Sequence, residues 1–168
     1  MVHDTKESFS EIQVVTFKVE EENYAVSVSN VKEIILPVDT FPVPGMKKPV
    51  KGVINLRGEI VPVLEIHSIL GLPGSNKEKR QNDKRFMILD SEDSVVGFEV
   101  DSVMEVVKFK EDIIQRSPHI GKKTINEDVL LGIIHSKSEI IIVIDPVKLM
   151  NSCMDMDELA RSIKFSNC

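Results

Sequence analysis

The sequence predicts a mainly β protein made of two copies of a small, mostly antiparallel unit of about five strands. Three observations support this class. Apolar residues alternate with polar ones along several segments, helical periodicity is confined to short stretches, and the chain repeats itself internally. A unit of this size closes into a small barrel, which removes the unpaired edges that an open sheet would expose.

Alternation with a period of two marks the expected strands. It occurs at Val15–Val19, Tyr24–Val28 and Val96–Val100. Such segments are typical of strands with one face on a core and one face in water. Ile140–Ile144 is instead apolar and β-branched throughout, which predicts a strand buried on both faces.

Short helices are expected at three places. Ile66–Leu70 predicts a single helical turn that Gly71 ends. Asp145 before Pro146 is typical of an N-cap followed by proline at the first helical position, so a short helix should run to Met150. Apolar residues spaced three and four apart predict an amphipathic helix in the C-terminal extension, 151–168.

Two stretches should be loops. Four of the eight prolines lie from Pro37 to Pro49, so the backbone there is extended and poor in hydrogen-bond donors. Segment 71–85 has five basic and two acidic residues and no apolar residue after Pro73, which predicts a solvated linker. The alternative for its basic residues is contact with an anionic membrane surface or nucleic acid.

The internal repeat is the most informative feature. Sliding the chain by 72 residues places Val26–Ile35 on Phe98–Val107. An offset of 80 places Lys51–Glu65 on Leu131–Asp145. Apolar positions meet apolar positions nearly throughout, in the same order twice, although chance similarity between β segments is the alternative. Identical pairs include Val28 and Val100, Val31 and Val103, Glu33 and Glu105, and Gly52 and Gly132.

The repeat predicts the domain organisation. Two barrels are expected at about 13–70 and 86–150, joined by the polar linker, with an exchange of strands between them left open. Val28 and Val100 hold equivalent positions, so each should point into its own barrel.

Composition argues against several functional classes. The 168 residues carry a net charge of −6 and 5% aromatic residues. A nucleic-acid-binding barrel of the OB type, which needs a basic groove and stacking aromatics, is therefore disfavoured. No apolar run approaches the ~20 residues that cross a bilayer, and the polar start is unlike a signal peptide. We expect a cytoplasmic protein without direct membrane insertion.

The sequence offers little for catalysis. Its four histidines are scattered, and neither metal-ligand spacing nor a phosphate-binding glycine loop is found. Cys153 and Cys168 are expected to be reduced thiols, with a thiol-dependent enzyme using Cys153 as the alternative. We therefore predict no enzymatic activity, no metal and no cofactor.

One segment carries a family resemblance. Lys51–Glu65, which includes Gly-Val-Ile-Asn-Leu-Arg-Gly, resembles the signature of the CheW-like domain of bacterial chemotaxis proteins. Tyr24–Ile35, Val96–Asp101 and Leu131–Ile134 fit the same pattern in order and spacing. The resemblance covers residues 13–150. It implies two SH3-like five-stranded β-barrels packed together, in agreement with the repeat.

The resemblance also implies a function. It is that of a non-enzymatic adaptor binding the regulatory domain of the histidine kinase CheA and the cytoplasmic tip of a methyl-accepting chemoreceptor. Such a protein is recruited to membrane receptor arrays through its partners. A CheW-like adaptor serving another chemosensory output, such as surface motility or gene regulation, stays open.

Arg57 is the first candidate for a partner contact. It lies between Leu56 and Gly58 at an expected strand–turn junction, and its repeat counterpart is Lys137. The resemblance implies contact with receptor or kinase, or a brace for the receptor-binding surface. The alternative is an ion pair with a local carboxylate, Glu33 or Glu59, and both roles can hold together.

The remaining candidates come from the same resemblance. Val31 and Glu33 match a segment near the groove where receptor tips dock, although their repetition also suits core packing and a role in the fold. Residues of the loop around 117–120 match a region facing a neighbouring kinase domain, with a plain surface loop as the alternative. The full set of candidate partner-binding residues is Val31, Glu33, Asn55, Arg57, Ser117, His119 and Ile120.

Overall fold

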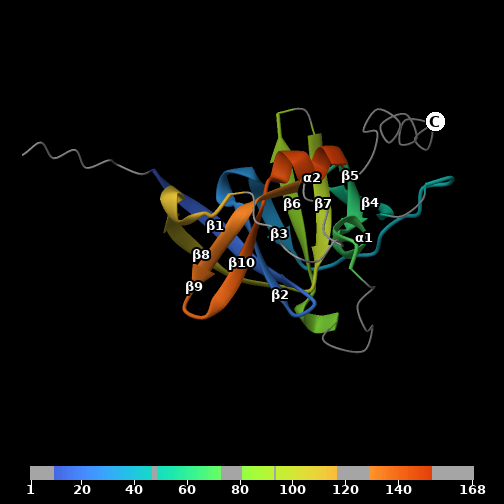
Figure 1. Ribbon diagram of the computed structural model, residues 1–168. Coiled ribbons are helices and arrows are strands. Elements are labelled where there is room, and N and C mark those ends of the chain that lie inside the picture. Colours follow the sequence, from blue (N-terminus) through green and yellow to red (C-terminus); the bar gives the residue numbers. More distant parts are fainter. Residues whose placement is uncertain (1–9, 47–48, 73–80, 93, 117–128, 153–168) are drawn as a thin grey trace, which may run out of the picture.

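The computed structural model describes residues 10–46, 49–72, 81–92, 94–116 and 129–152 (Figure 1). The predicted mainly β class is confirmed. The strands are β1 Glu11–Val19, β2 Glu22–Ser27, β3 Val31–Ile35, β4 Val50–Leu56, β5 Glu59–Glu65, β6 Arg85–Ser91, β7 Ser94–Val100, β8 Ser102–Lys110, β9 Leu130–Ser136 and β10 Glu139–Ile144. The short helices are α1 Ile66–Leu70 and α2 Pro146–Ser152, with 3-10 turns η1 Val28–Asn30, η2 Gln81–Asp83 and η3 Glu111–Ile113.

The strands form two five-stranded sheets, which make up two packed SH3-like subdomains. The first sheet has the order β8-β1-β2-β10-β9 and the second the order β3-β6-β7-β5-β4. In Figure 1 the first sheet lies to the left and the second to the right. Neighbouring strands are antiparallel except for the pairs β2–β10 and β5–β7, which are parallel.

The sheets do not follow the two halves of the chain. β1 and β2 pair with strands of the second half, and β3, β4 and β5 share a sheet with β6 and β7. The expected contiguous barrels at 13–70 and 86–150 are therefore wrong as sheet boundaries, and the strands are exchanged. The link between β7 and β8 gives a physical reason. It consists of Asp101 alone, and a β-hairpin needs two loop residues, so the chain crosses to the other sheet.

The internal repeat is confirmed element by element. β2 and β3 correspond to β7 and β8, and β4, β5 and α1 correspond to β9, β10 and α2. The β4–β5 and β9–β10 hairpins each close with two residues of positive φ. These are Arg57 and Gly58 in the first and Lys137 and Ser138 in the second. This is the geometry of a type I′ turn, whose twist matches that of the flanking strands.

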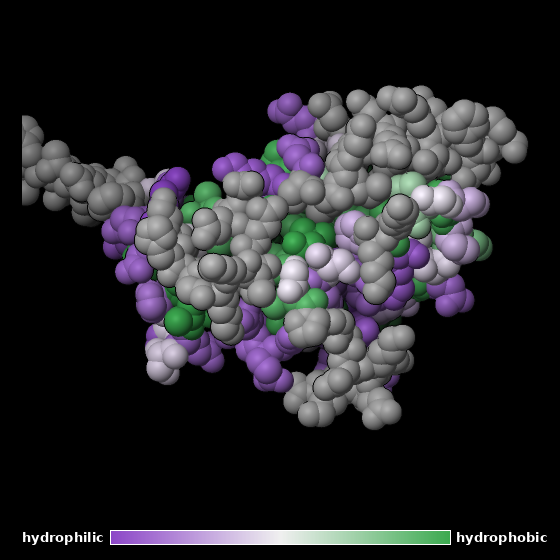
Figure 2. Space-filling model, turned by 45° about the vertical axis from the view of Figure 1, so that its right-hand side comes forward, coloured by the Kyte–Doolittle hydropathy of each residue, from purple (hydrophilic) through white to green (hydrophobic). Residues whose placement is uncertain are grey.

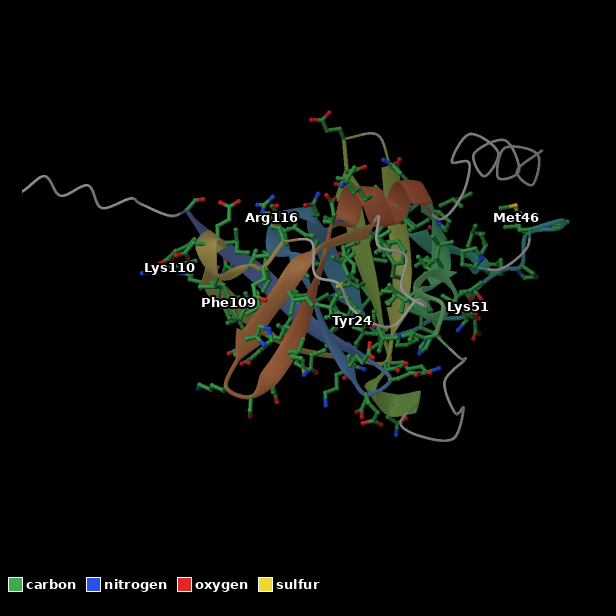
Figure 3. The ribbon with its side chains drawn as sticks, viewed as in Figure 1. Tyr24, Met46, Lys51, Phe109, Lys110 and Arg116 are labelled. Carbon is green, nitrogen blue, oxygen red and sulfur yellow. The ribbon has the colours of Figure 1, made fainter. Side chains whose placement is uncertain are left out.

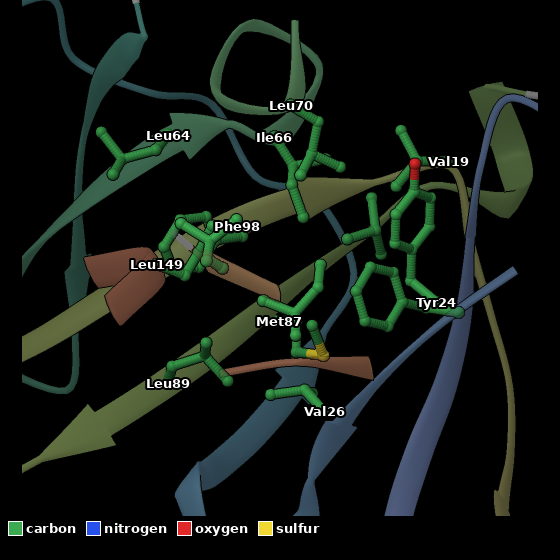
Figure 4. Close-up of a cluster of buried hydrophobic side chains, with 14 of the residues drawn as sticks. Val19, Tyr24, Val26, Leu64, Ile66, Leu70, Met87, Leu89, Phe98 and Leu149 are labelled. Atoms are coloured by element: carbon green, nitrogen blue, oxygen red, sulfur yellow. The ribbon is translucent and has the colours of Figure 1, made fainter. Parts of the chain in front are cut away.

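A central apolar cluster joins the sheets. Its buried side chains come from both sheets and both helices, and Figure 4 shows ten of them with labels: Val19, Tyr24, Val26, Leu64, Ile66, Leu70, Met87, Leu89, Phe98 and Leu149. Each sheet also has a smaller cluster on its other face, one including Val14 and Ile134, the other Ile54 and Ile88. Burial of apolar area on both faces is the main stabilising contribution to such a fold.

This arrangement corrects three expectations. The central strands are buried on both faces rather than half exposed; in β7, for example, Gly97 and Glu99 on one face and Phe98 on the other are all buried. Val28 and Val100 do not point into separate barrels, because both pack on the central cluster. Val28 also lies in η1 instead of a strand, and it is only half-buried.

The short helices agree with the sequence signals. The Asp145 Oδ1 atom accepts hydrogen bonds from the backbone N–H groups of Val147 and Lys148, at 3.0 and 3.2 Å, as an N-cap does. Gly71 ends α1 in the left-handed conformation, with φ of 70°. In β10 the expected burial on both faces holds from Ile141 to Ile144 but fails at Ile140, which is exposed. The expected C-terminal helix and both cysteines lie outside the described residues.

Candidate partner-binding surface

The β4–β5 turn positions Arg57. The Asn55 Oδ1 atom accepts a hydrogen bond from the Gly58 N–H at 2.7 Å, which fixes the turn from inside. Arg57 has φ of 51°, an uncommon conformation for a residue with a side chain, and 73% of its side chain is exposed. Asn55 therefore shapes the turn, while Arg57 presents its guanidinium at the surface.

Arg57 makes an ion pair with Glu33. The Arg57 Nη1 atom lies 2.8 Å from Glu33 Oε2, and beside it Lys32 Nζ lies 3.2 Å from Glu59 Oε2. Glu33 and Lys32 belong to β3, one edge of the second sheet, and the turn belongs to the hairpin that forms its other edge. The two ion pairs thus bridge the edges of the sheet. Of the two expected carboxylate partners for Arg57, the structure selects Glu33.

Glu33 is the less exposed partner. Its side chain is 20% exposed, and its Oε1 atom is buried without a hydrogen-bond partner among the described residues. Its repeat counterpart Glu105 is exposed, and there the side chain of Thr16 bonds to the Glu105 backbone instead. The two glutamates therefore have different environments, and the ion pair with Arg57 belongs to the first copy.

Val31 lies at the start of the same edge strand. It is half-buried and packs against the central cluster. It therefore contributes to the packing between sheets, and only part of its surface is open to a partner. The other three candidates, Ser117, His119 and Ile120, lie outside the described residues.

The sequence analysis missed an exposed apolar strip that follows Lys32 and Glu33 in the chain. It follows β3 into the proline-rich loop, where four large apolar side chains are exposed. Its members are Ile34, Leu36, Val38 and Phe41, with Leu36 and Phe41 each 65% exposed. The apolar residues were visible in the sequence, but the prolines predicted a plain loop. On the face shown in Figure 2, apolar surface appears as separate areas among polar side chains.

A second charged group stabilises the second sheet. Glu99 in β7 is nearly buried and pairs with Lys51 of β4 and with Lys84, whose Nζ atom lies 3.5 Å from Glu99 Oε1. Lys51 also lies over the Phe86 ring, 5.7 Å from its centre. These contacts hold the Lys51 side chain against the second sheet. In Figure 3 Lys51 lies at one end of the molecule and Arg116 towards the other.

The described residues contain neither a metal-binding cluster nor a membrane-spanning helix. No three His, Cys, Asp or Glu side chains gather there in a way that could hold a metal ion. Within the same residues, no helix has both the length and the apolar character needed to cross a membrane.

The fold and surface define a class of protein: two packed SH3-like barrels that present charged and apolar side chains at strand edges and turns, as protein-binding modules do. The family model of the CheW-like domain matches residues 13–154. The chain therefore belongs to the CheW-like domain family.

Individual relatives agree with this family. The chain is 31% identical to a chemotaxis protein CheW of Treponema pallidum over 143 residues, covering 84% of each chain. It is 32% identical to a chemotaxis protein CheW of Thermotoga maritima over 147 residues, 86% of this chain and 91% of the relative. The crystal structure of the scaffolding protein TtCheW from Thermoanaerobacter tengcongensis superposes with a TM-score of 0.71 at 30% identity, covering 80% and 89% of the chains. The chain is accordingly a chemotaxis adaptor of the CheW type and not an enzyme.

Proposed function

We propose that this adaptor links the histidine kinase CheA, through its regulatory domain, to the cytoplasmic tips of methyl-accepting chemoreceptors. The observation that carries the proposal is the match to the CheW-like domain over residues 13–154, which includes both sheets. An adaptor that holds two partners raises the effective concentration of one beside the other, so receptor changes can bias the kinase. The protein would work in the cytoplasm and reach receptor arrays through these partners.

The exposed edge of the second sheet is the surface we assign to a partner. Arg57 offers a charged, solvent-exposed guanidinium, and the strip from Ile34 to Phe41, which follows Glu33 in the chain, offers apolar area. A helical receptor tip or a strand edge of a kinase domain would bury such apolar side chains and pair with the charge. Glu33 and Asn55 would act by holding Arg57 in place.

The second copy offers a different surface. In the turn equivalent to that of Arg57, Lys137 and Ser138 replace Arg57 and Gly58, and Glu105 is exposed. Apolar Met104 and Val106 are exposed on β8, the edge of the first sheet. Two chemically different edges suit two different partners. Ser117, His119 and Ile120, which belong to the second copy in the sequence, remain proposed contacts.

The test is reconstitution with purified components. The full chain would be mixed with the isolated regulatory domain of CheA and, separately, with a receptor cytoplasmic fragment, and each affinity measured by calorimetry. We expect binding to each partner alone and a three-component complex when all are mixed. Binding of neither partner, with capture of a different histidine kinase and receptor from native lysate, would favour the adaptor of another chemosensory output.

A further inference from the structure

A buried histidine lies where three segments of the fold meet. The His67 Nε2 atom in α1 is 3.3 Å from Asp101 Oδ2, and His67 is 7% exposed. Asp101 is the single residue that carries the chain from β7 in the second sheet to β8 in the first. The same Oδ2 atom accepts a hydrogen bond from the Glu20 N–H at 2.6 Å, in the β1–β2 turn of the first sheet. One carboxylate thus ties both sheets together.

The backbone of Asp101 strengthens this junction. Its N–H donates to the Lys18 carbonyl oxygen at 3.0 Å, at the end of β1. Its second carboxylate oxygen, Oδ1, is buried without a hydrogen-bond partner among the described residues. The Asp101 side chain is partly buried, and desolvating an oxygen that has no partner is costly, so its remaining contacts determine how well it is held.

The pair is present on one side of the repeat only. In the other copy Val147 replaces His67, and Ser29 replaces Asp101, at offsets of 80 and 72. Val147 is exposed, and Ser29 bonds to its neighbours Ser27 and Asn30. The equivalent junction forms without a charged pair, so the fold itself does not require one.

We propose that His67 and Asp101 form a pH-sensitive ion pair that links the two sheets. The link is strong while the imidazole is protonated and weakens when the imidazole loses that proton. The charged groups facing the imidazole are Asp101 from the sheet crossing, Glu20 from the β1–β2 turn, and Lys84 from the segment before β6. Two are acidic and one is basic, so the surroundings favour the imidazolium.

The direction of the effect follows from these contacts. The hydrogen bond to Asp101 raises the pKa of His67 above its ordinary value of 6.5, against the opposing effect of burial. A raised pKa in the folded state gives stability that is complete below 6.5 and is lost as pH rises through the raised value. For Asp101, burial alone would raise the pKa, but the hydrogen bonds from His67 and Glu20 outweigh it and the pKa is lowered. Its contribution is lost only as pH falls through that lowered value.

The experiment is a pH titration of the full chain by NMR. The imidazole signals of the four histidines would be followed, with His67→Gln used to assign that of His67. We expect the His67 midpoint to lie higher in the native chain than in the same chain unfolded in urea, and to fall in Asp101→Asn. This variant removes the charge but keeps an oxygen that can accept from Glu20.

A second measurement tests whether the ion pair between His67 and Asp101 stabilises the fold in a pH-dependent way. Urea unfolding of the parent and His67→Gln would be compared at about pH 6 and about pH 9, on either side of the expected titration. At the lower pH we expect the unfolding equilibrium constant of the parent to be severalfold smaller than that of His67→Gln. At the higher pH the difference should be smaller. His135→Gln, at an exposed position of β9, is the control and should show no such change. A native His67 midpoint equal to the unfolded one, or a parent advantage independent of pH, would overturn the proposal.

Discussion

Gly52 and Phe41 approach so closely that a Cβ atom on Gly52 would lie 2.6 Å from the Phe41 carbonyl oxygen. Phe41 and Val53 exchange two backbone hydrogen bonds at this point, of 2.8 and 2.9 Å. The second copy repeats the arrangement. A Cβ on Gly132 would lie 2.6 Å from the Gln115 carbonyl oxygen, where Gln115 and Ile133 exchange two bonds. Glycine at both positions lets an incoming loop bond to the edge hairpin.

Alanine at either glycine should therefore destabilise the protein. At both positions the clash includes backbone, which cannot move aside as a flexible side chain can, and at Gly132 it also includes the Ile114 side chain. Gly52→Ala and Gly132→Ala should therefore each lower the free energy of unfolding by about 1–3 kcal/mol. Urea unfolding followed by circular dichroism measures this. Gly58→Asn is the control, because nothing lies within 4 Å of an added Cβ there and asparagine tolerates positive φ. Unchanged midpoints in both alanine variants would contradict the close approach.

Tyr24 offers a spectroscopic test of the central cluster. It is the single tyrosine of a chain without tryptophan, it is fully buried, and its hydroxyl donates to Glu22 Oε2 at 2.7 Å. Burial, then this bond and the charges of Glu22 and Glu20, raise the pKa of Tyr24 far above its ordinary range. The folded chain keeps its proton where the unfolded chain loses it, so stability should fall as pH rises above about 10.

We expect no tyrosinate absorbance from the native chain near pH 10. The absorbance should appear only together with the loss of the β-sheet circular dichroism signal. Glu22→Gln removes a neighbouring negative charge. In this variant the pH at which tyrosinate appears and the pH at which the circular dichroism signal is lost should shift by the same amount. Tyrosinate formed near pH 10 with the sheet signal intact would show that the hydroxyl is accessible.

Local features of this chain were predictable from sequence, and pairing between distant strands was not. The Asp145–Pro146 signal and Gly71 act within a few residues, so the start of α2 and the end of α1 could be predicted. The repeat was visible because both copies form the same elements. Strand exchange depends instead on which edges meet in space, and alternation cannot encode that when both faces of a strand are buried.

The candidate site shows the same division. The turn at Arg57, and the replacement of Arg57 by Lys137 in the second copy, could be predicted from the sequence. The choice of Glu33 over Glu59 was not, because it depends on how the edge strand β3 meets the hairpin. The apolar strip was missed because exposure of Leu36 and Phe41 depends on what the loop packs against.

Shared packing of Val28 and Val100 predicts cooperative behaviour. Both pack on the central cluster, although they occupy corresponding places in different copies. Val100→Ala should cost about 1–3 kcal/mol, because Val100 is fully buried, and Val28→Ala less, because Val28 is half-buried. Native-state hydrogen exchange should rise in both sheets for either variant. Exchange that rises in one sheet while the other stays protected would show that the sheets open independently.

The ion pair between Arg57 and Glu33 can be separated into a structural and a partner-binding contribution. Because most of the Arg57 side chain is exposed, Arg57→Ala should change the free energy of unfolding by no more than about 1 kcal/mol. If Arg57 contacts a partner, losing that charge-assisted contact should cost about 1.5–3 kcal/mol of binding, roughly ten- to a hundredfold in affinity. Calorimetry with the CheA regulatory domain and with the receptor fragment measures each loss.

A charge exchange decides between the two contributions. The double variant Arg57→Glu with Glu33→Arg restores an opposite-charge pair in the turn but reverses the charge that a partner meets. We expect the double variant to recover thermal stability without recovering binding. Lys137→Ala, in the corresponding turn of the second copy, should leave binding of that same partner intact. Recovery of both properties would make Arg57 a brace of the sheet edges alone, because its position would then matter only through Glu33.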